Sequence, residues 1–264
     1  MTNGHNEYIR QFKIMKRIVI ISQIALLLFI ISLWELLAHF NIIDPFIFSK
    51  PSQILMLFGK YIKSNELFIH TLVSTYEVLL GLIIGTSLGL IIAIILYEIK
   101  ILSKILDPYL IVLNALPKTA LAPIFIIWVG TNITGIIFVS ISISLIITII
   151  NALNAFNNVE EEKIKLFKTF NASKIQILRY LLLPANTNEI LNIIRINIGM
   201  SWIGVIVGEF IVSKRGLGYL ITYGTQIFRL DIVMMGVVTL AIVTILMYQS
   251  LNLIAKIIKK NKGN

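Results

Sequence analysis

Long apolar stretches constrain this chain more than any other feature of its sequence. A helix needs about 20 apolar residues to cross a lipid bilayer. Five stretches meet that length, at residues 18–40, 78–97, 133–153, 190–212 and 232–254. A sixth, at 105–129, is interrupted by Pro117, Lys118 and Pro123, so we expect a kinked or broken helix buried in the bundle. The pattern predicts an all-α membrane protein with about six transmembrane helices.

The composition agrees with a lipid-facing surface. The chain is 57% hydrophobic and 14% charged, whereas a soluble domain is roughly 45–50% apolar and roughly 25% charged. The net charge of +10 comes from basic residues in short connections and tails, without interleaved aromatics, so no nucleic-acid partner is expected. Cysteine is absent and His5, His39 and His70 are far apart, so we expect no metal site.

The distribution of Lys and Arg predicts the orientation of the helices. If the N-terminus is cytoplasmic, the inner segments carry fifteen of these residues and the outer segments carry six. Because basic residues favour the cytoplasmic side, we expect both termini and the long loop 154–189 there. The chain then divides into a cytoplasmic N-terminal segment (1–17), a multi-pass transmembrane domain (18–255) and a basic cytoplasmic tail (256–264).

The loop 154–189 has the pattern of a helical hairpin. Ile164, Phe167 and Phe170 recur every three residues among lysines, which predicts a short amphipathic helix. Asn171 tolerates the left-handed conformation that ends a helix, and Ser173 begins a Ser-Lys-Ile-Gln capping box.

A second helix should run from that box to the leucines before Pro184, which should stop it. Such a hairpin either lies flat in the lipid interface or inserts Phe167 and Phe170 into the groove of a soluble partner. The pattern alone leaves both readings open.

Several stretches of the chain resemble one family of transport proteins. KLFKTFNASKIQILRYLLLP resembles the cytoplasmic coupling loop of binding-protein-dependent ABC importers, which has the form E-A-A-x-x-x-G followed by L-P. LDPYLIVLNALPKTALAPIFIIWVG (106–130), GEF (208–210) and RGLGYLI (215–221) are similar to the nitrate/sulfonate/taurine branch. The resemblance runs from about Pro51 to the last helix.

This resemblance implies a type I ABC importer permease fold in the plasma (inner) membrane, with 18–255 as the permease domain. It implies a permease homodimer, an ABC ATPase subunit on the cytoplasmic side and an extracytoplasmic binding protein that delivers a small polar solute such as a sulfonate, nitrate or taurine. The ATPase-coupling residues would be Lys165, Leu166, Phe167, Lys168, Phe170, Asn171, Ala172 and Ser173.

The chain departs from the family's coupling motif. The family's Glu falls at Lys165, its Gly at Asn171 and its alanines at Leu166 and Phe167. Asn171 keeps the turn. The reversed charge at Lys165 speaks against a salt bridge to the ATPase there, and the larger Leu-Phe pair implies a different groove in the partner.

Two polar helix faces are candidates for the translocation path. Ser140, Ser144, Thr148 and Asn151 share one face of 133–153, and a second stripe on 190–212 comprises Asn197, Ser201, Gly204 and Gly208. Ser and Thr in membrane helices also bond their own carbonyls, which leaves packing as an alternative. Gly81, Gly85 and Gly89 permit close helix contact, within one subunit or between two.

Three further residues join the path candidates, Asn114 and Lys118 in the broken segment and Glu209. Glu209 faces the path or pairs with Lys214 or Arg215, since a lone carboxylate in a membrane is costly. Lys118 meets an anion in the path or extends its charged end to the interface.

ATP chemistry must come from a partner, because the chain has no GxxxxGK[ST] phosphate loop. We therefore expect no cofactor and no enzymatic activity in this chain. An ion-driven secondary transporter is the alternative function, but it calls for internal repeats and paired broken helices, and only one broken segment is present.

Overall fold

The computed structural model describes residues 2–262, and side chains over 10–257. The described part is helical and contains no strand. Its elements are α1 (Thr2–His39), α2 (Pro45–Phe48), α3 (Pro51–Lys63), α4 (Glu66–Glu98), α5 (Lys100–Ala115), α6 (Lys118–Val129), α7 (Ile133–Asn157), α8 (Glu161–Thr169), α9 (Lys174–Ile177), the π-helix η1 (Leu178–Leu182), α10 (Leu183–Ala185), α11 (Thr187–Val212), α12 (Leu217–Gln226) and α13 (Leu230–Lys262).

The expected set of membrane spans is confirmed. Five helices, α1, α4, α7, α11 and α13, are long and apolar enough to cross a bilayer. Helices α5 and α6 pass the same test only when taken together as one bent pair, with a bend of 100° at Leu116 and Pro117, and this pair is the candidate for the sixth span. Neither Pro108 nor Pro123 breaks its helix.

The expectation that this broken span is buried in the bundle is wrong for the single chain. Helix α5 has no buried residue, and α6 buries only Ala122 and Ile126. The carbonyl oxygen of Asn114, next to the break, lies 3.4 Å from the Nζ of Lys118. A local side chain therefore supplies a hydrogen-bond donor to one backbone carbonyl at the break.

Helices α4, α7 and α11 form the centre of the molecule. A Cβ built on Gly81, Gly85 or Gly89 of α4 would collide with Ser140, Ser144 or Thr148 of α7, respectively. On α11, a Cβ on Gly204 would lie 2.5 Å from the Cα of Ser140. Small residues thus let three helix backbones approach closely, and the α4 glycines make their contact within one subunit.

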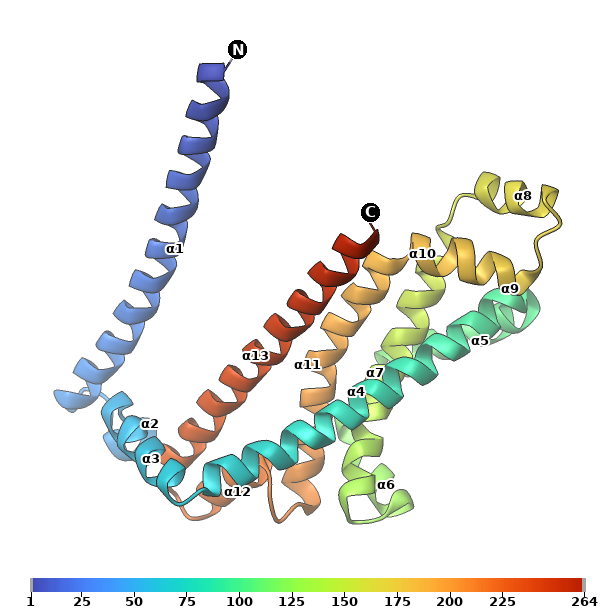
Figure 1. The fold of residues 1–264 in the computed structure, drawn as a ribbon. Helices are drawn as coiled ribbons and strands as arrows, with labels where there is room; N and C mark the ends of the chain where they lie inside the picture. Colours follow the sequence, from blue (N-terminus) through green and yellow to red (C-terminus); the bar gives the residue numbers. More distant parts are fainter. Residues whose placement is uncertain (1, 263–264) are drawn as a thin grey trace.

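The hairpin α8–α10 lies at the same end of the molecule as the start of α1 and the end of α13 (Figure 1). Helices α2, α3 and α12 lie at the opposite end, as does the short helix α6. Helix α1 runs without a break through residue 17, so the proposed boundary at 17/18 does not coincide with a helix end. It stands away from the bundle, and its apolar window contains no buried residue (Figure 1).

Candidate functional site

The turn of the hairpin has the predicted structure. Helix α8 begins with Glu161 and Glu162, which suits the positive end of the helix dipole. Asn171 adopts a left-handed conformation with φ of 53°. The Ser173 backbone N–H donates to Gln176 Oε1 at 2.7 Å, and the Gln176 N–H donates to Ser173 Oγ at 3.3 Å. The capping box and the asparagine turn are both confirmed.

The second helix does not stop at Pro184 as expected. After α9 the backbone widens into the π-helix η1, in which the N–H of Leu183 donates to the carbonyl of Leu178. Pro184 has no N–H to donate and its ring would crowd the carbonyl four residues earlier in an α-helix. The wider turn accommodates the ring, so the helix continues to Ala185, and the Nδ2 of the following Asn186 donates to the Leu182 carbonyl at 2.9 Å.

The two phenylalanines of the hairpin lie in different environments. Phe167 is half-buried against the core formed by α4, α7 and η1. Phe170 is 79% exposed, and Leu166, Ile175 and Tyr180 are exposed with it. A groove of about 390 Å³ runs between Leu166, Phe170 and Tyr180. We call these four exposed residues (Leu166, Phe170, Ile175 and Tyr180) the hairpin patch.

The charges on the hairpin are mostly paired within the chain. Lys165 Nζ lies 3.4 Å from Glu161 on the same helix, and both side chains are largely exposed. Lys174 Nζ lies 3.0 Å from Glu98 at the end of α4, which ties the hairpin to the bundle. Lys168 lines a second groove of about 380 Å³ beside this contact. Lys165 therefore replaces the family's acid with a residue that pairs within its own helix.

The hydroxyls predicted for the path lie inside the packed centre. Ser140, Ser144 and Thr148 have no exposed surface. Ser144 Oγ donates to the Ser140 carbonyl at 3.0 Å, Thr148 Oγ1 donates to the Ser144 carbonyl at 2.8 Å, and Ser140 Oγ donates to the Ser201 carbonyl at 3.3 Å. These hydrogen bonds to backbone carbonyls are the ones expected if the hydroxyls serve helix packing. A role of the three residues in the translocation path stays a prediction.

Asn197 joins the three central helices. It is fully buried, and its Nδ2 donates to Thr86 Oγ1 at 2.8 Å and to Thr148 Oγ1 at 2.7 Å. One residue from each of α4, α7 and α11 therefore meets at this amide. Ser201 lies on the same helix and is also fully buried.

Glu209 has partners that the sequence did not indicate. Its carboxylate accepts from Ser74 Oγ and from the Gly218 N–H, both at 2.5 Å. Glu77 lies beside it, and Gly216, with φ of 112°, leaves no room for a Cβ against it. Neither Lys214 nor Arg215 forms a salt bridge with it in the described chain.

The hydrogen bonds of Glu209 and Ser74 hold the turn before α12 against α4 and α11. The Leu217 N–H also donates to Ser74 Oγ at 2.7 Å. Ser74 and Glu77 lie before the predicted span 78–97, so the sequence pattern did not place them among the candidate residues of the translocation path. An acidic residue just before a long apolar run was the available signal.

One polar groove opens at the hairpin end between α7, α11 and α13. Its volume is about 540 Å³, and Asn151 is the only residue of the predicted path that lines it.

Arg195 of α11 also lines this groove, and the sequence pattern did not indicate it as a candidate. Of the 23 Lys and Arg residues, only Lys118 and Arg195 fall in neither the inner nor the outer segments, and that was the available signal. Asn114 and Lys118 lie at the bend between α5 and α6, away from this groove.

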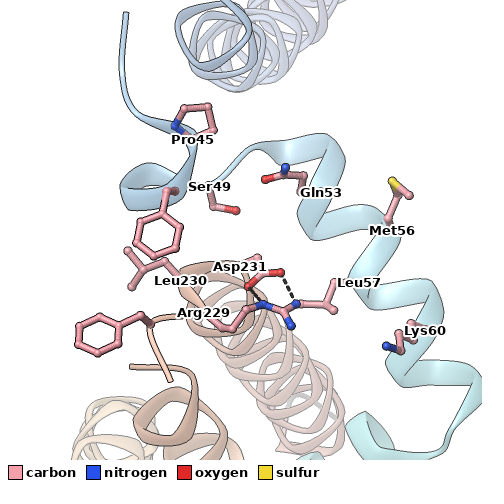
Figure 2. A pocket seen from close by; sticks show the side chains of 11 residues that line it. Pro45, Ser49, Gln53, Met56, Leu57, Lys60, Arg229, Leu230 and Asp231 are labelled. Carbon is pink, nitrogen blue, oxygen red and sulfur yellow. Dashed lines mark hydrogen bonds and ion pairs between the residues drawn. The ribbon is translucent and has the colours of Figure 1, made fainter. Parts of the chain in front are cut away.

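Another groove, of about 720 Å³, opens at the opposite end of the molecule (Figure 2). Phe46 of α2, Met56 and Lys60 of α3 and the segment 228–231 line it. Arg229 Nε donates to Asp231 Oδ1 at 2.8 Å, and this hydrogen bond raises the pKa of Arg229. The guanidinium stays charged at any physiological pH and is already paired.

No group of three or more His, Asp or Glu residues in the described chain is placed to hold a metal ion.

The chain is similar over most of its length to several transport permeases. An aliphatic sulfonates transport permease of Bacillus subtilis is 30% identical and aligns over 81% of this chain and 78% of its own length. The taurine transport system permease of Escherichia coli is 25% identical, with 85% and 83% covered.

A third relative is the riboflavin transport system permease of Chloroflexus aurantiacus, 26% identical with 88% and 87% covered. Residues 85–263 match the family described as the binding-protein-dependent transport system inner membrane component. That match includes five of the six spans in part or whole, the hairpin and the segment 208–221. The match to this family does not favour the alternative of an ion-driven secondary transporter. The chain therefore belongs to the inner membrane components of binding-protein-dependent transport systems, as the permease of an ABC importer.

Proposed function

We propose that two copies of this permease form the path for a small polar solute and that the hairpin binds an ABC ATPase subunit. The hairpin patch carries this proposal. Leu166, Phe170, Ile175 and Tyr180 are exposed on a hairpin whose lysines and glutamates otherwise face water. Apolar side chains that cluster around a groove outside the apolar spans are best explained by a protein partner.

The orientation follows from the same picture. The hairpin, the start of α1 and the end of α13 share one end, and this end carries most of the basic residues. We place it in the cytoplasm, so the opposite end faces the extracytoplasmic binding protein. ATP is bound by the partner and not by this chain.

The relatives support a small polar solute, but they are named for different ones. Their names include aliphatic sulfonates, taurine and riboflavin at similar levels of identity. We propose a sulfonate, because the relative that reaches 30% identity is named for aliphatic sulfonates. Uptake of labelled methanesulfonate and taurine into vesicles containing the complete importer tests this choice, and uptake of neither would contradict it.

The coupling proposal is tested with Phe170→Ala. Burying a phenylalanine ring stabilises a complex by about 1.5–3 kcal/mol, so its loss should weaken ATPase binding by roughly ten- to a hundred-fold. Phe228→Ala is the matched control for co-purification of the ATPase, because Phe228 is 73% exposed at the opposite end. Co-purification of the ATPase is measured first, and uptake in vesicles second.

Because Phe170 makes little contact with its own chain, the variant should melt at the wild-type temperature. Phe167→Ala differs, since Phe167 also packs against the core, and it should lower both stability and binding. Wild-type ATPase retention together with wild-type uptake in Phe170→Ala would show that the hairpin patch is not the coupling surface.

A further inference from the structure

Arg195 is a charged residue inside a membrane span that has no acidic partner. Its Nε donates to Asn252 Oδ1 at 3.1 Å, and its Nη1 donates to Asn192 Oδ1 at 2.6 Å. None of the salt bridges in the described chain includes it. A charged group at such a position is costly and usually functional. Two amide oxygens orient the guanidinium, but they leave its charge uncompensated.

The groove in front of Arg195 is lined by hydrogen-bonding groups. Asn151, Asn154 and Asn158 follow one face of the last turns of α7 and line it. Their side-chain amides have no hydrogen-bond partner within the described chain, so their N–H groups are available to a ligand. Tyr248 of α13 closes one side.

The positions of the two charges in the groove, rather than their sum, favour an anion. Arg195 is its one cation in the described lining and Glu189 its one carboxylate. Glu189 is exposed in the first turn of α11, where the helix dipole stabilises it. Arg195 is half-buried, and electrostatic interactions are stronger away from water. The deeper charge therefore governs what binds.

We propose that this groove binds the oxyanion group of a small solute, with Arg195 supplying the charge and the α7 asparagines supplying amide donors. A guanidinium presents its N–H groups as a planar fork that matches the oxygens of a sulfonate, carboxylate or phosphate. The inference rests on the proposed function, in which this end is cytoplasmic. The groove is then the last binding position of the solute before release.

A purely structural role predicts different behaviour. If Arg195 only ties α11 to α13 through Asn252, its loss lowers stability and the groove binds nothing. If the groove is an anion site, binding depends on the charges at both its deep and its exposed end. Glu189 provides a variant at the exposed end that leaves every contact of Arg195 intact.

The probe is methanesulfonate, with uncharged dimethyl sulfone as its neutral analogue. Its binding to the permease–ATPase complex, purified without the binding protein, is measured by saturation-transfer NMR on the methyl protons. Arg195→Gln should weaken binding by about tenfold or more, since charge-assisted bonds are lost. Glu189→Gln should strengthen it, because repulsion is removed. Lys256→Gln, an exposed lysine near the same end of α13, is the control and should change nothing.

Three results would overturn the anion site: no saturable binding to the wild type, equal binding of the sulfone, or wild-type affinity in both Arg195→Gln and Glu189→Gln. Uptake of methanesulfonate into vesicles then tests whether the anion that binds in the groove is the transported solute. Lower uptake in Arg195→Gln at the wild-type melting temperature assigns the site to the transported solute, and unchanged uptake with lost binding overturns its place on the path. ATPase co-purification separates these results from a failure of the proposed function, which depends on Phe170 and not on Arg195.

Discussion

Replacing Gly204 by alanine tests the close packing at the centre of the molecule. The added Cβ would lie 2.5 Å from the Cα and 2.9 Å from the N of Ser140, where ordinary contact requires about 3.5–4.0 Å. Both atoms belong to the backbone of α7, so no side-chain rotation relieves the overlap. Helices α7 and α11 must move apart by about 1 Å.

The size of the effect follows from two opposing terms. Overpacking a core costs about 1–3 kcal/mol, whereas alanine gains up to about 1 kcal/mol over glycine in helix propensity. Gly199→Ala on the same helix is the matched control, because its Cβ would meet nothing within 4 Å. It receives the propensity gain without the overlap, so the two variants should differ by about 1–3 kcal/mol.

The assay is thermal unfolding of each variant in the same detergent, followed by size-exclusion chromatography. At about 2–4 °C per kcal/mol, Gly204→Ala should melt about 2–12 °C below Gly199→Ala. Equal melting temperatures would refute the reasoning, because they would mean that α7 and α11 are not held at the distance described.

Two further predictions concern orientation and the buried amide. In this cysteine-free chain, Asn158→Cys should react with impermeant thiol reagents only from the cytoplasmic side and Ser64→Cys only from outside, since they lie at opposite ends; the reverse pattern would contradict the orientation. Asn197→Ala should lower stability by about 0.5–2 kcal/mol, the range for hydrogen bonds between membrane helices, because Thr86 and Thr148 lose their shared donor. Unchanged melting with lost uptake would instead place Asn197 on the path.

Local features of the hairpin were predictable because they depend on a few adjacent residues. The left-handed turn at Asn171 and the capping box at Ser173 follow from backbone conformation and short-range hydrogen bonds. The behaviour at Pro184 was not, because a helix can widen by one residue and continue past a proline. A proline in the sequence indicates a disturbance of the helix and does not say which form it takes.

Contacts between helices were less predictable. The glycines of α4 and the hydroxyls of α7 were recognised as two stripes with separate roles, yet Gly85 packs directly against Ser144. Periodicity shows that a face is small or polar but not which other face meets it. Glu209 illustrates the same limit, since its partner Ser74 is 135 residues away in the sequence.

Arg195 was missed for a related reason. The charge count that predicts orientation uses the connecting segments, so a basic residue inside an apolar stretch does not enter it. Its place in a groove became apparent only when α7, α11 and α13 were brought together.

The position of α1 has a consequence for how this chain responds to its surroundings. Its apolar window contains no buried residue, and near its end the N–H and Oγ of Ser52 in α3 donate hydrogen bonds to the Glu35 carboxylate. Because α1 is attached at one end only, packing along its length does not fix its tilt angle. The thickness of the bilayer and whatever lies beside α1 therefore determine its tilt. Lipid composition should therefore change the tilt of α1 more than it changes the packing of the central helices.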